Sequence, residues 1–319
     1  MDRAVEDRFL GCLLGLACGD AVGTTVEFRP RGTFPPVQDM VGGGPFALKP
    51  GQWTDDTSMA LCLAESLITR GGFDPRDQME RYWRWYQDGY WSATGSCFDI
   101  GNTVREALHR FRQSGEPFSG SAEPHRAGNG CIMRLGPVAL YYNPHREKAV
   151  FYAGQSAKTT HGAAECVEAC RLLADLLVRA LDGENKDNLL RTESERIKSP
   201  LLAIRSEKIA AIARGDYLQK PVERIRGSGY VVESLEAALY CFARTESFEA
   251  AVLMAANLGD DADTTAAVCG QIAGAYYGES GIPRPWLEKL AMAERIRALG
   301  RALMSGPAPE KEPPPQNVP

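Results

Sequence analysis

The sequence has few of the features that mark membrane, secreted or nucleic-acid-binding proteins. Its 319 residues contain no uninterrupted apolar run of the roughly 18 residues that a membrane helix needs. The N-terminus, MDRAVEDRFL, is too charged to be the apolar core of a signal peptide. The net charge of −5 and the lack of a Lys/Arg block give no basic surface for nucleic acid. We therefore expect neither a membrane nor a nucleic acid as a partner.

Cysteine and histidine are not spaced as metal ligands or as a disulfide framework. The nine cysteines are scattered without a C-x-x-C pair, and the chain has only four histidines. Several of the cysteines, such as Cys62, Cys166 and Cys170, fall at positions expected in helix cores. An odd number of buried thiols is typical of a reducing compartment. The pattern argues against zinc and predicts a cytoplasmic protein.

Alternating β-strand patterns are also scarce, whereas helical periodicity recurs along the chain. Apolar residues follow helical spacing over residues 10–21, 60–67, 166–181, 235–242 and 287–303. Stretches rich in Gly and Pro predict loops at 29–52, 114–130, 182–200 and 278–285. We predict an all-α fold with one domain over residues 1–304, followed by a Pro-rich, disordered tail over residues 305–319.

Glycine recurs at every fourth position of the first predicted helix, at Gly11, Gly15, Gly19 and Gly23. Each glycine costs a helix about 1 kcal/mol relative to alanine. Four glycines on one face therefore predict that a neighbouring helix approaches this backbone closely. The end of this helix would then lie near the centre of the fold.

Two clusters of acids and threonines stand at predicted helix starts. The first is TDDT at residues 54–57, and the second is GDDADTT at residues 259–265. One interpretation of TDDT is a helix cap, with Thr54 capping and Asp55 and Asp56 placed favourably against the helix dipole. The second cluster is harder to explain in this way, because a cap needs one acid and not three.

The second cluster favours a metal site. Asp261 and Asp263, with Thr264 following, present alternating oxygens, and neighbouring carboxylates repel one another unless a cation lies between them. A ligand set made only of oxygens suits magnesium or manganese better than zinc. The residues alone therefore predict a divalent-metal site built from two helix starts.

Seven ordered blocks make the chain similar to a known family. They are GLACGDAVGTTVEF, LKPGQWTDDTSMALCLAESL, FDIGNTVREAL, AGNGCIMRLGPVALYY, KTTHGAAECVEACRLLADLL, GYVVESLEAALYCF and NLGDDADTTAAVCGQIAGAYYG. In this order they resemble the ADP-ribosylglycohydrolase family, and most closely its dinitrogenase reductase-activating glycohydrolase branch. The likeness runs from about residue 7 to residue 300.

The resemblance implies a compact, orthogonal helical bundle with a binuclear magnesium or manganese centre in a cleft. Motif by motif, the metal ligands would be Thr54, Asp55, Asp56, Asp261, Asp263 and Thr264. Glu27 would be an acid beside the metals, and Glu27, Asp56 and Asp99 would be the catalytic residues. Five carboxylates and two divalent cations nearly balance in charge. Asp260 is left out, because some relatives carry glycine at its position.

The resemblance also implies a set of substrate-binding residues, each with a plainer interpretation. Gly128, Asn129 and Gly130 would offer backbone N–H groups to the diphosphate, although their pattern alone indicates an ordinary turn. His161 would line the ADP-ribose pocket, or be a helix-start residue without a role. Tyr230 would be a platform for adenine, or part of the core, and Arg134 is interpreted as structural.

Asp99 and Asn102, in FDIGNT, bear on specificity. From the residues alone, Asp99 would be a helix cap and Asn102 a turn residue. In the branch that the chain resembles, this motif faces the scissile side of the substrate. A carboxylate there pairs with a guanidinium in the bidentate manner that arginine permits, and it can move protons as the ribose ring opens. The motif therefore favours arginine as the modified side chain.

The predicted function is a metal-dependent hydrolase that removes ADP-ribose from arginine side chains. Its partners would be an ADP-ribosylated protein and the product ADP-ribose, and a monomer is expected. Three alternatives stay open: hydrolysis of serine-linked or free ADP-ribose derivatives, an ADP-ribose-binding pseudoenzyme, and a purely structural helical protein. The intact acidic clusters argue against the last two.

Overall fold

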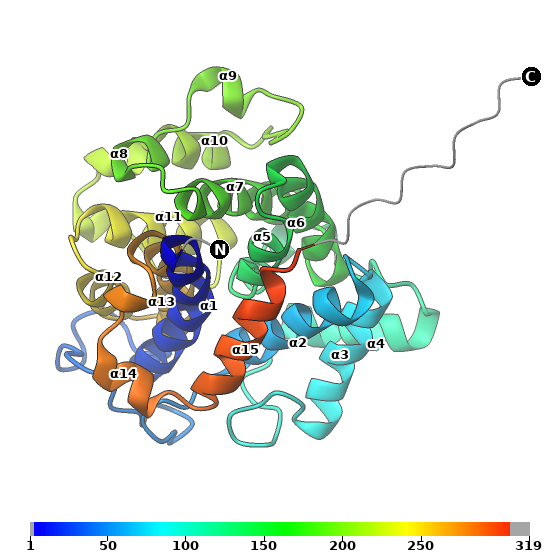
Figure 1. The fold of residues 1–319 in the computed structure, drawn as a ribbon, viewed down its shortest axis with the longest axis horizontal. Coiled ribbons are helices and arrows are strands. Elements are labelled where there is room, and N and C mark those ends of the chain that lie inside the picture. The colour runs from blue at the N-terminus through cyan, green and yellow to red at the C-terminus, as the bar shows by residue number, and fades with distance from the viewer. Residues whose placement is uncertain (1–2, 307–319) are drawn as a thin grey trace, which may run out of the picture.

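The computed structural model describes residues 3–306, whose regular elements are all helices (Figure 1). The α-helices are α1 (Arg3–Gly23), α2 (Asp55–Arg70), α3 (Pro75–Asp88), α4 (Asn102–Ser114), α5 (Gly136–Tyr142), α6 (Arg146–Thr160), α7 (Ala164–Leu181), α8 (Lys186–Leu189), α9 (Ser194–Ile197), α10 (Glu207–Arg214), α11 (Val231–Ala243), α12 (Phe248–Ala256), α13 (Ala262–Tyr277), α14 (Arg284–Lys289) and α15 (Ala293–Leu303). The short 3₁₀ helices are η1 (Thr24–Val26), η2 (Pro124–Arg126), η3 (Asp216–Gln219), η4 (Val222–Arg224) and η5 (Glu279–Gly281).

The predicted all-α class is confirmed. Over residues 3–306 the only β-type pairings are three isolated bridges between loop segments or chain turns. One predicted helix is wrong, because residues 287–303 do not form a single helix. The chain breaks between α14 and α15, where Met292 takes a left-handed conformation with φ of 55°. A left-handed residue cannot continue a right-handed helix, so the apolar periodicity runs through a bend.

The predicted tail, residues 305–319, lies almost entirely outside the described residues. Only Ser305 and Gly306 of the tail are described, and their N–H groups donate to the carbonyls of Ala302 and Leu303 at 3.2 and 3.0 Å. These two bonds continue the turn at the end of α15. The disorder of the tail stays a prediction.

Helices α1 and α13 pack backbone against backbone at the centre of the molecule (Figure 1). A Cβ atom added at Gly11, Gly15 or Gly19 would lie only 2.3, 2.3 or 2.1 Å from a carbonyl oxygen of α13. Those oxygens belong to Gly274, Gly270 and Ala266 in turn. The close approach predicted from the glycine spacing is therefore present. Only residues without a Cβ permit it.

The same register brings the two predicted metal segments together. Each step of four residues forward along α1 meets a step of four residues backward along α13, so the helices are antiparallel. Gly23, at the end of α1, consequently faces Ala262, at the start of α13. Glu27 follows α1 by only a short 3₁₀ turn, and this places it beside the acids of the second cluster.

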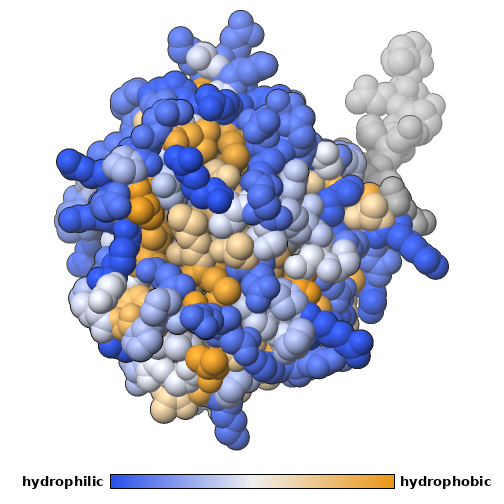
Figure 2. Space-filling view, turned by 90° about the vertical axis from the view of Figure 1, so that its left-hand side faces the viewer, coloured by the Kyte–Doolittle hydropathy of each residue, from blue (hydrophilic) through white to orange (hydrophobic). Residues whose placement is uncertain are grey.

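Helix α1 is a core helix. The stretch Arg3–Val26 is long and apolar enough to cross a membrane, but 94% of the apolar 18-residue window within it is buried inside the protein. Helices α11 and α12 pack on α13, α2 packs on α3, and α6 packs on α7. Trp53, Trp85 and Trp286 are among the largest fully buried side chains. Figure 2 shows one outer face, where hydrophilic side chains predominate and hydrophobic ones form separate patches.

Candidate metal and substrate site

The start of α2 is capped by a residue of another helix. Asp20, buried in α1, accepts hydrogen bonds from the N–H and hydroxyl of Thr54, both at 2.9 Å. Its second oxygen accepts from the N–H and hydroxyl of Thr57, at 3.0 and 2.6 Å. Thr54 is the N-cap residue by position, but its side chain makes no capping bond. The interpretation of Thr54 as the capping side chain is therefore wrong.

The start of α13 is capped in the same manner. Glu27 accepts hydrogen bonds from the N–H groups of Ala262 and Asp263, at 2.8 and 3.1 Å. Asp261, the N-cap residue by position, makes no side-chain capping bond. Asp20 in α1 and Glu27 just after it therefore cap the two helix starts. The side chains of the acidic clusters are not needed as caps and are free to bind a ligand.

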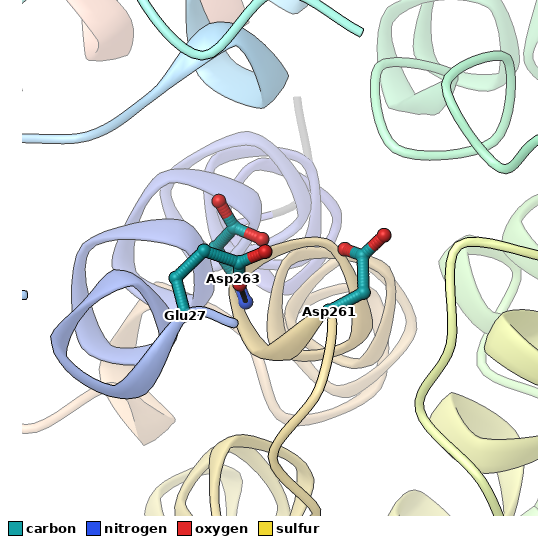
Figure 3. Close-up of side chains that lie close together, drawn as sticks. All are labelled: Glu27, Asp261 and Asp263. Atoms are coloured by element: carbon teal, nitrogen blue, oxygen red, sulfur yellow. Dashed lines mark hydrogen bonds between the residues drawn. The ribbon is translucent and has the colours of Figure 1, made fainter. Parts of the chain in front are cut away.

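The side chains of the clusters converge. One carboxylate oxygen each of Glu27, Asp261 and Asp263 lies within 4.8 Å of the others, and Figure 3 shows the three side chains gathered at the start of α13. The Thr54 hydroxyl lies 3.3 Å from carboxylate oxygens of both Asp56 and Asp263.

Thr264, which follows Asp263 in α13, joins the same group. Its hydroxyl lies 3.3 Å from the Asp56 oxygen that Thr54 also contacts, and its N–H donates to Asp263 at 2.6 Å. The other oxygen of Asp56 is buried without a hydrogen-bond partner. The predicted ligand residues from the two clusters therefore form one oxygen-rich cluster across the two helix starts.

Burial and mutual repulsion shift the titration of this cluster upward. Burial, followed by the charge of Asp263, raises the pKa values of Asp55 and Asp56 well above their ordinary range. The same causes raise the pKa of Glu27, and they raise that of Asp261 to about 7. Carboxyls held this close retain protons unless a cation replaces them.

The residues fit a hard divalent cation. All of the donors are oxygens, several carboxylates share one buried space, and one buried oxygen has no partner. Oxygen-only sets of this kind are those preferred by Mg²⁺ and Mn²⁺. Burying such carboxylates without a cation would be expensive. The cluster therefore has the composition of a metal site.

Asp99 lines one cavity, of about 330 Å³, together with acids of this cluster. Burial, then the charges of Asp55 and Asp263, raise the pKa of Asp99 to about 11, and its carboxyl makes a hydrogen bond with that of Asp263. The N-cap position of α4 is occupied by Gly101. Asp99 is therefore not the helix cap that one interpretation predicted.

Asn102 lines the same cavity, but it is more exposed. It is the first residue of α4 rather than a turn residue, and its side-chain oxygen accepts a hydrogen bond from Arg105. Arg105 thereby orients the amide of Asn102 at the rim of the cavity.

The loop at 127–130 is joined to the segment before α11. Asn129 donates its N–H to the Gly229 carbonyl at 3.0 Å, and its side chain donates to Asp261 at 3.1 Å. Gly128 donates its N–H to Arg126 at 2.8 Å. Two of the three expected diphosphate donors are therefore already engaged. In the described chain, Gly130 makes no backbone hydrogen bond through its N–H, so this group is the available donor of the loop.

His161 packs directly against this loop. A Cβ atom at Gly130 would lie 2.9 Å from the imidazole ring, and one at Gly128 would lie 3.3 Å from Nε2. The ring is buried, and burial lowers the pKa of His161 to about 4, so the imidazole is neutral at neutral pH. These contacts explain why two glycines flank Asn129.

A buried hydrogen-bond chain sets the tautomer of His161. Arg134 donates to the Thr160 hydroxyl at 2.6 Å, and that hydroxyl lies 2.8 Å from Nδ1 of His161. Because arginine has no acceptor, the Thr160 oxygen accepts from it. Among the described residues, Nδ1 is the only acceptor within hydrogen-bond distance of the Thr160 hydroxyl, so the hydroxyl donates its own hydrogen to Nδ1. We therefore assign the remaining ring hydrogen to Nε2, which faces the loop.

Tyr230 lines a second cavity, of about 820 Å³, which adjoins the first at Gly128 and Gly229. Its hydroxyl donates to Glu165 at 2.5 Å and accepts from Lys208 at 2.8 Å. The Lys208 ammonium also lies 5.1 Å from the centre of the tyrosine ring. Tyr230 is thus a fixed, half-buried ring in the larger cavity, which Asp99 does not line.

Sequence reasoning missed Asp20, Phe28 and Gly229. Asp20 had a signal, because a lone acid inside an apolar, glycine-rich helix is buried only when it is paired. Gly229 leaves room for Asp261, since a Cβ there would lie 3.2 Å from its carboxylate. Phe28 had no signal in the sequence, because its exposure depends on the tertiary fold.

Comparisons with known proteins place the chain in a family. A sequence profile described as ADP-ribosylglycohydrolase matches residues 1–312, and the chain belongs to this family. It is 44% identical to the ADP-ribosylarginine hydrolase Tri1 of Serratia proteamaculans over 96% of this chain and 81% of that protein. It is 46% identical to the ADP-ribosylarginine hydrolase Tri1 of Pseudomonas putida over 93% of this chain and 78% of that protein.

Two further relatives extend the comparison. The ADP-ribosyl-dinitrogen reductase glycohydrolase of Rhodospirillum rubrum is 33% identical over 91% of this chain and 92% of its own length. A solved structure titled as an ADP-ribosylglycohydrolase-related protein complex superposes with a TM-score of 0.85 and 45% identity, covering 96% of this chain and all of that one. The helical fold is therefore that of the family.

Proposed function

We propose that this protein is a metal-dependent hydrolase that removes mono-ADP-ribose from arginine side chains of modified proteins. The observation that carries the proposal is the convergence of two acidic helix starts on one cavity that Asp99 also lines. The two Tri1 relatives are named ADP-ribosylarginine hydrolases, which supports the choice of arginine. The partners would be the modified protein as substrate and free ADP-ribose as product.

The cofactor would be two divalent cations, Mg²⁺ or Mn²⁺. The residues that would hold them are Thr54, Asp55, Asp56, Asp261, Asp263 and Thr264, with Glu27 beside them. These residues and Glu27 include five carboxylates, whose negative charge exceeds the charge of one divalent cation. This excess supports two cations. When bound, the cations would supply Lewis acidity toward the hydroxyls of the distal ribose and toward water.

Asp99 would act on the bond that breaks. Hydrolysis adds a hydroxyl to the anomeric carbon and returns a hydrogen to the departing guanidine nitrogen. In the free protein, the raised pKa of Asp99 supports a carboxyl that can take up a proton beside this bond. A bound guanidinium would favour the ionised carboxylate, which is suited to pair with it. Glu27 and Asp56 would shape the charge around the distal ribose, Glu27 through its hold on the start of α13.

The rest of the substrate would extend from the acidic cluster toward Tyr230. The Gly130 N–H and the His161 Nε2–H are the donors that would meet the diphosphate. Neutral His161 would donate to the phosphate without adding charge. The ring of Tyr230 would be the platform for adenine in the larger cavity.

The experiment is a matched substrate assay. The purified protein is incubated with an arginine-ADP-ribosylated peptide and a serine-ADP-ribosylated peptide, each with Mg²⁺, with Mn²⁺ and with EDTA. Released ADP-ribose is measured by liquid chromatography and mass spectrometry. We expect hydrolysis of the arginine-linked peptide that depends on the divalent cation.

Other results would assign a different function. Preferential hydrolysis of the serine-linked peptide would support the alternative linkage. Tight binding of ADP-ribose without hydrolysis of either peptide would indicate a pseudoenzyme. We also propose that the protein works as a monomer in a reducing cytoplasm, for which the nine free cysteines provide support. Light scattering of the purified protein tests the oligomeric state.

A further inference from the structure

The residues that line the two cavities place the parts of an ADP-ribosylated substrate in order. The larger cavity contains Tyr230 and meets the smaller one at Gly128. The smaller cavity is lined by the acidic cluster and by Asp99 and Phe28, none of which lines the larger one. Whatever is attached to the distal ribose would therefore lie against Asp99 and Phe28.

Phe28 lines the smaller cavity, and two further aromatic rings pack in a row beside it. We name Phe28, Phe46 and Phe98 the aromatic lip. The ring centres of Phe28 and Phe46 are 6.3 Å apart in an edge-to-face arrangement. Those of Phe46 and Phe98 are 5.2 Å apart. Phe28 follows Glu27 in the chain and Phe98 precedes Asp99, so the lip connects the two segments that carry these acids.

Phe28 is held outward in a conformation that a bulky residue rarely takes. Its φ is 62°, in the left-handed region, and 64% of its surface is exposed. Its N–H donates to the carbonyl of Asp260 at 2.8 Å, and Asp260 donates in return to the carbonyl of Arg29 at 2.8 Å. The pair of bonds ties this turn to the loop before α13. An exposed ring in a strained turn contributes little to folding, and such features collect at functional sites.

We infer that the aromatic lip binds the arginine side chain that carries the ADP-ribose, with the guanidinium between the Asp99 carboxyl and the ring face of Phe28. The inference rests on the proposed function and names the contact that selects its substrate. A guanidinium is attracted both to an aromatic face and to a carboxylate. Because it is weakly hydrated, its transfer from water to these two groups costs little. The three methylenes of arginine would then cross the lip.

The same geometry disfavours a serine linkage. In serine-linked ADP-ribose the peptide backbone lies only two bonds from the glycosidic oxygen, so the backbone itself would have to reach the lip. It would present neither a cation nor a flexible stem to Phe28. The lip therefore fits a long cationic side chain better than a short neutral one.

The test compares Phe28→Ala, Phe28→Trp and the control Phe151→Ala. Phe151 is 51% exposed on α6 and lines neither cavity, so it matches Phe28 in size and exposure. Each variant is assayed for kcat/KM on an ADP-ribosyl-arginine peptide and for calorimetric affinity toward free ADP-ribose. Thermal unfolding verifies that each variant folds.

We expect Phe28→Ala to lose about fivefold to tenfold in kcat/KM on the arginine-linked peptide, the range of a cation–π contact. Phe28→Trp should retain the wild-type value, because tryptophan is the better cation–π partner. Affinity for free ADP-ribose should stay unchanged in both, and Phe151→Ala should match the wild type in every measurement.

Two results would overturn the inference. One is a Phe28→Ala enzyme whose kcat/KM equals that of the wild type. The other is an equal loss of ADP-ribose affinity, which would mean that the ring supports the pocket and not the departing arginine. Failure of the proposed function is distinguishable, because the wild-type protein would then leave the arginine-linked peptide intact.

Discussion

Asp20 of α1 and Thr57 of α2 are joined by two hydrogen bonds, one to the Thr57 N–H at 3.0 Å and one to its hydroxyl at 2.6 Å. A carboxylate that caps a helix from another element fixes the position of that helix start, and not only its stability. The acids at 55 and 56 are thereby held toward α13. Asp20 does not line the cavity, so it positions the site from behind.

Asp20→Ala should weaken both folding and metal binding. Two buried N–H groups lose their acceptor, which should lower the free energy of unfolding by about 2–4 kcal/mol. Metal affinity should fall about tenfold to a hundredfold, as for other residues that orient ligands. Asp74→Ala is the control, because Asp74 caps α3 far from the cavity. It should cost about 1 kcal/mol and leave metal affinity unchanged. Urea unfolding measures the free energy of unfolding of each variant, and Mn²⁺ calorimetry measures its metal affinity.

The metal-free protein should lose stability as pH rises. The pKa values of Asp20 and Asp261 are raised by burial and by Asp263 to about 7. Because the folded protein then binds these protons more tightly than the unfolded chain, the stabilisation is complete below about pH 4 and disappears as pH passes about 7. In EDTA the melting temperature should fall between about pH 5 and pH 8, and Mg²⁺ should restore it at the upper end. A melting temperature that rises with pH in EDTA would contradict this expectation.

Asp261→Asn should have opposite effects with and without metal. Without metal it removes one repelling carboxylate, so the melting temperature in EDTA should stay equal or increase. The rise in melting temperature that Mn²⁺ causes should be smaller in Asp261→Asn than in the wild type, and hydrolysis should nearly cease. Asp260→Asn is the control, since Asp260 is the exposed neighbour with φ of 57°, a conformation that asparagine tolerates. If Asp261→Asn were fully active, Asp261 would not be a ligand.

Thr160 lines neither cavity, but Thr160→Val should disturb His161, which lines the smaller one. The change removes the hydroxyl between Arg134 and Nδ1, so the ring hydrogen is no longer directed to Nε2. ADP-ribose affinity should fall about tenfold, the value of one hydrogen bond to a charged group. Thr160→Ser keeps the hydroxyl and should rescue the affinity. Nitrogen-15 spectra of the imidazole report the tautomer directly, and an unchanged tautomer in Thr160→Val would refute the assignment.

Asp99→Asn should separate catalysis from binding. Removing one partner of a desolvated ion pair costs about 3–5 kcal/mol, so turnover on an arginine-linked peptide should fall by at least a hundredfold. The affinity for free ADP-ribose should persist, because the expected contacts of that ligand lie with Gly130, His161 and Tyr230. Calorimetry beside the kinetic assay decides the matter, and undiminished turnover would remove Asp99 from the mechanism.

The sequence was sufficient for what depends on local spacing. Helical periodicity predicted α2, α7 and α11, and the glycine row predicted the close contact of α1 with α13. The acidic clusters were recognisable because three acids exceed what one cap requires. Each of these features depends only on residues that are close together in the sequence.

What could not be predicted depends on partners far apart in sequence. Nothing near Thr54 indicates that Asp20 takes over its capping role, and nothing near Asn129 indicates that its N–H is already bonded to Gly229. The break at Met292 also escaped, because the apolar spacing continues through it. Such choices are made by tertiary contacts, which local patterns do not encode.

The backbone contact between α1 and α13 also determines where this chain can change length. An α-helix turns by about 100° and rises about 1.5 Å per residue. One residue inserted between Gly11 and Asp20 would therefore rotate Asp20 away from α2, or else drive the glycines out of register with α13. The two helices cannot shift closer together to accommodate the change, because their backbones are already in contact. Insertions should instead accumulate in segments such as 182–200, which line neither cavity.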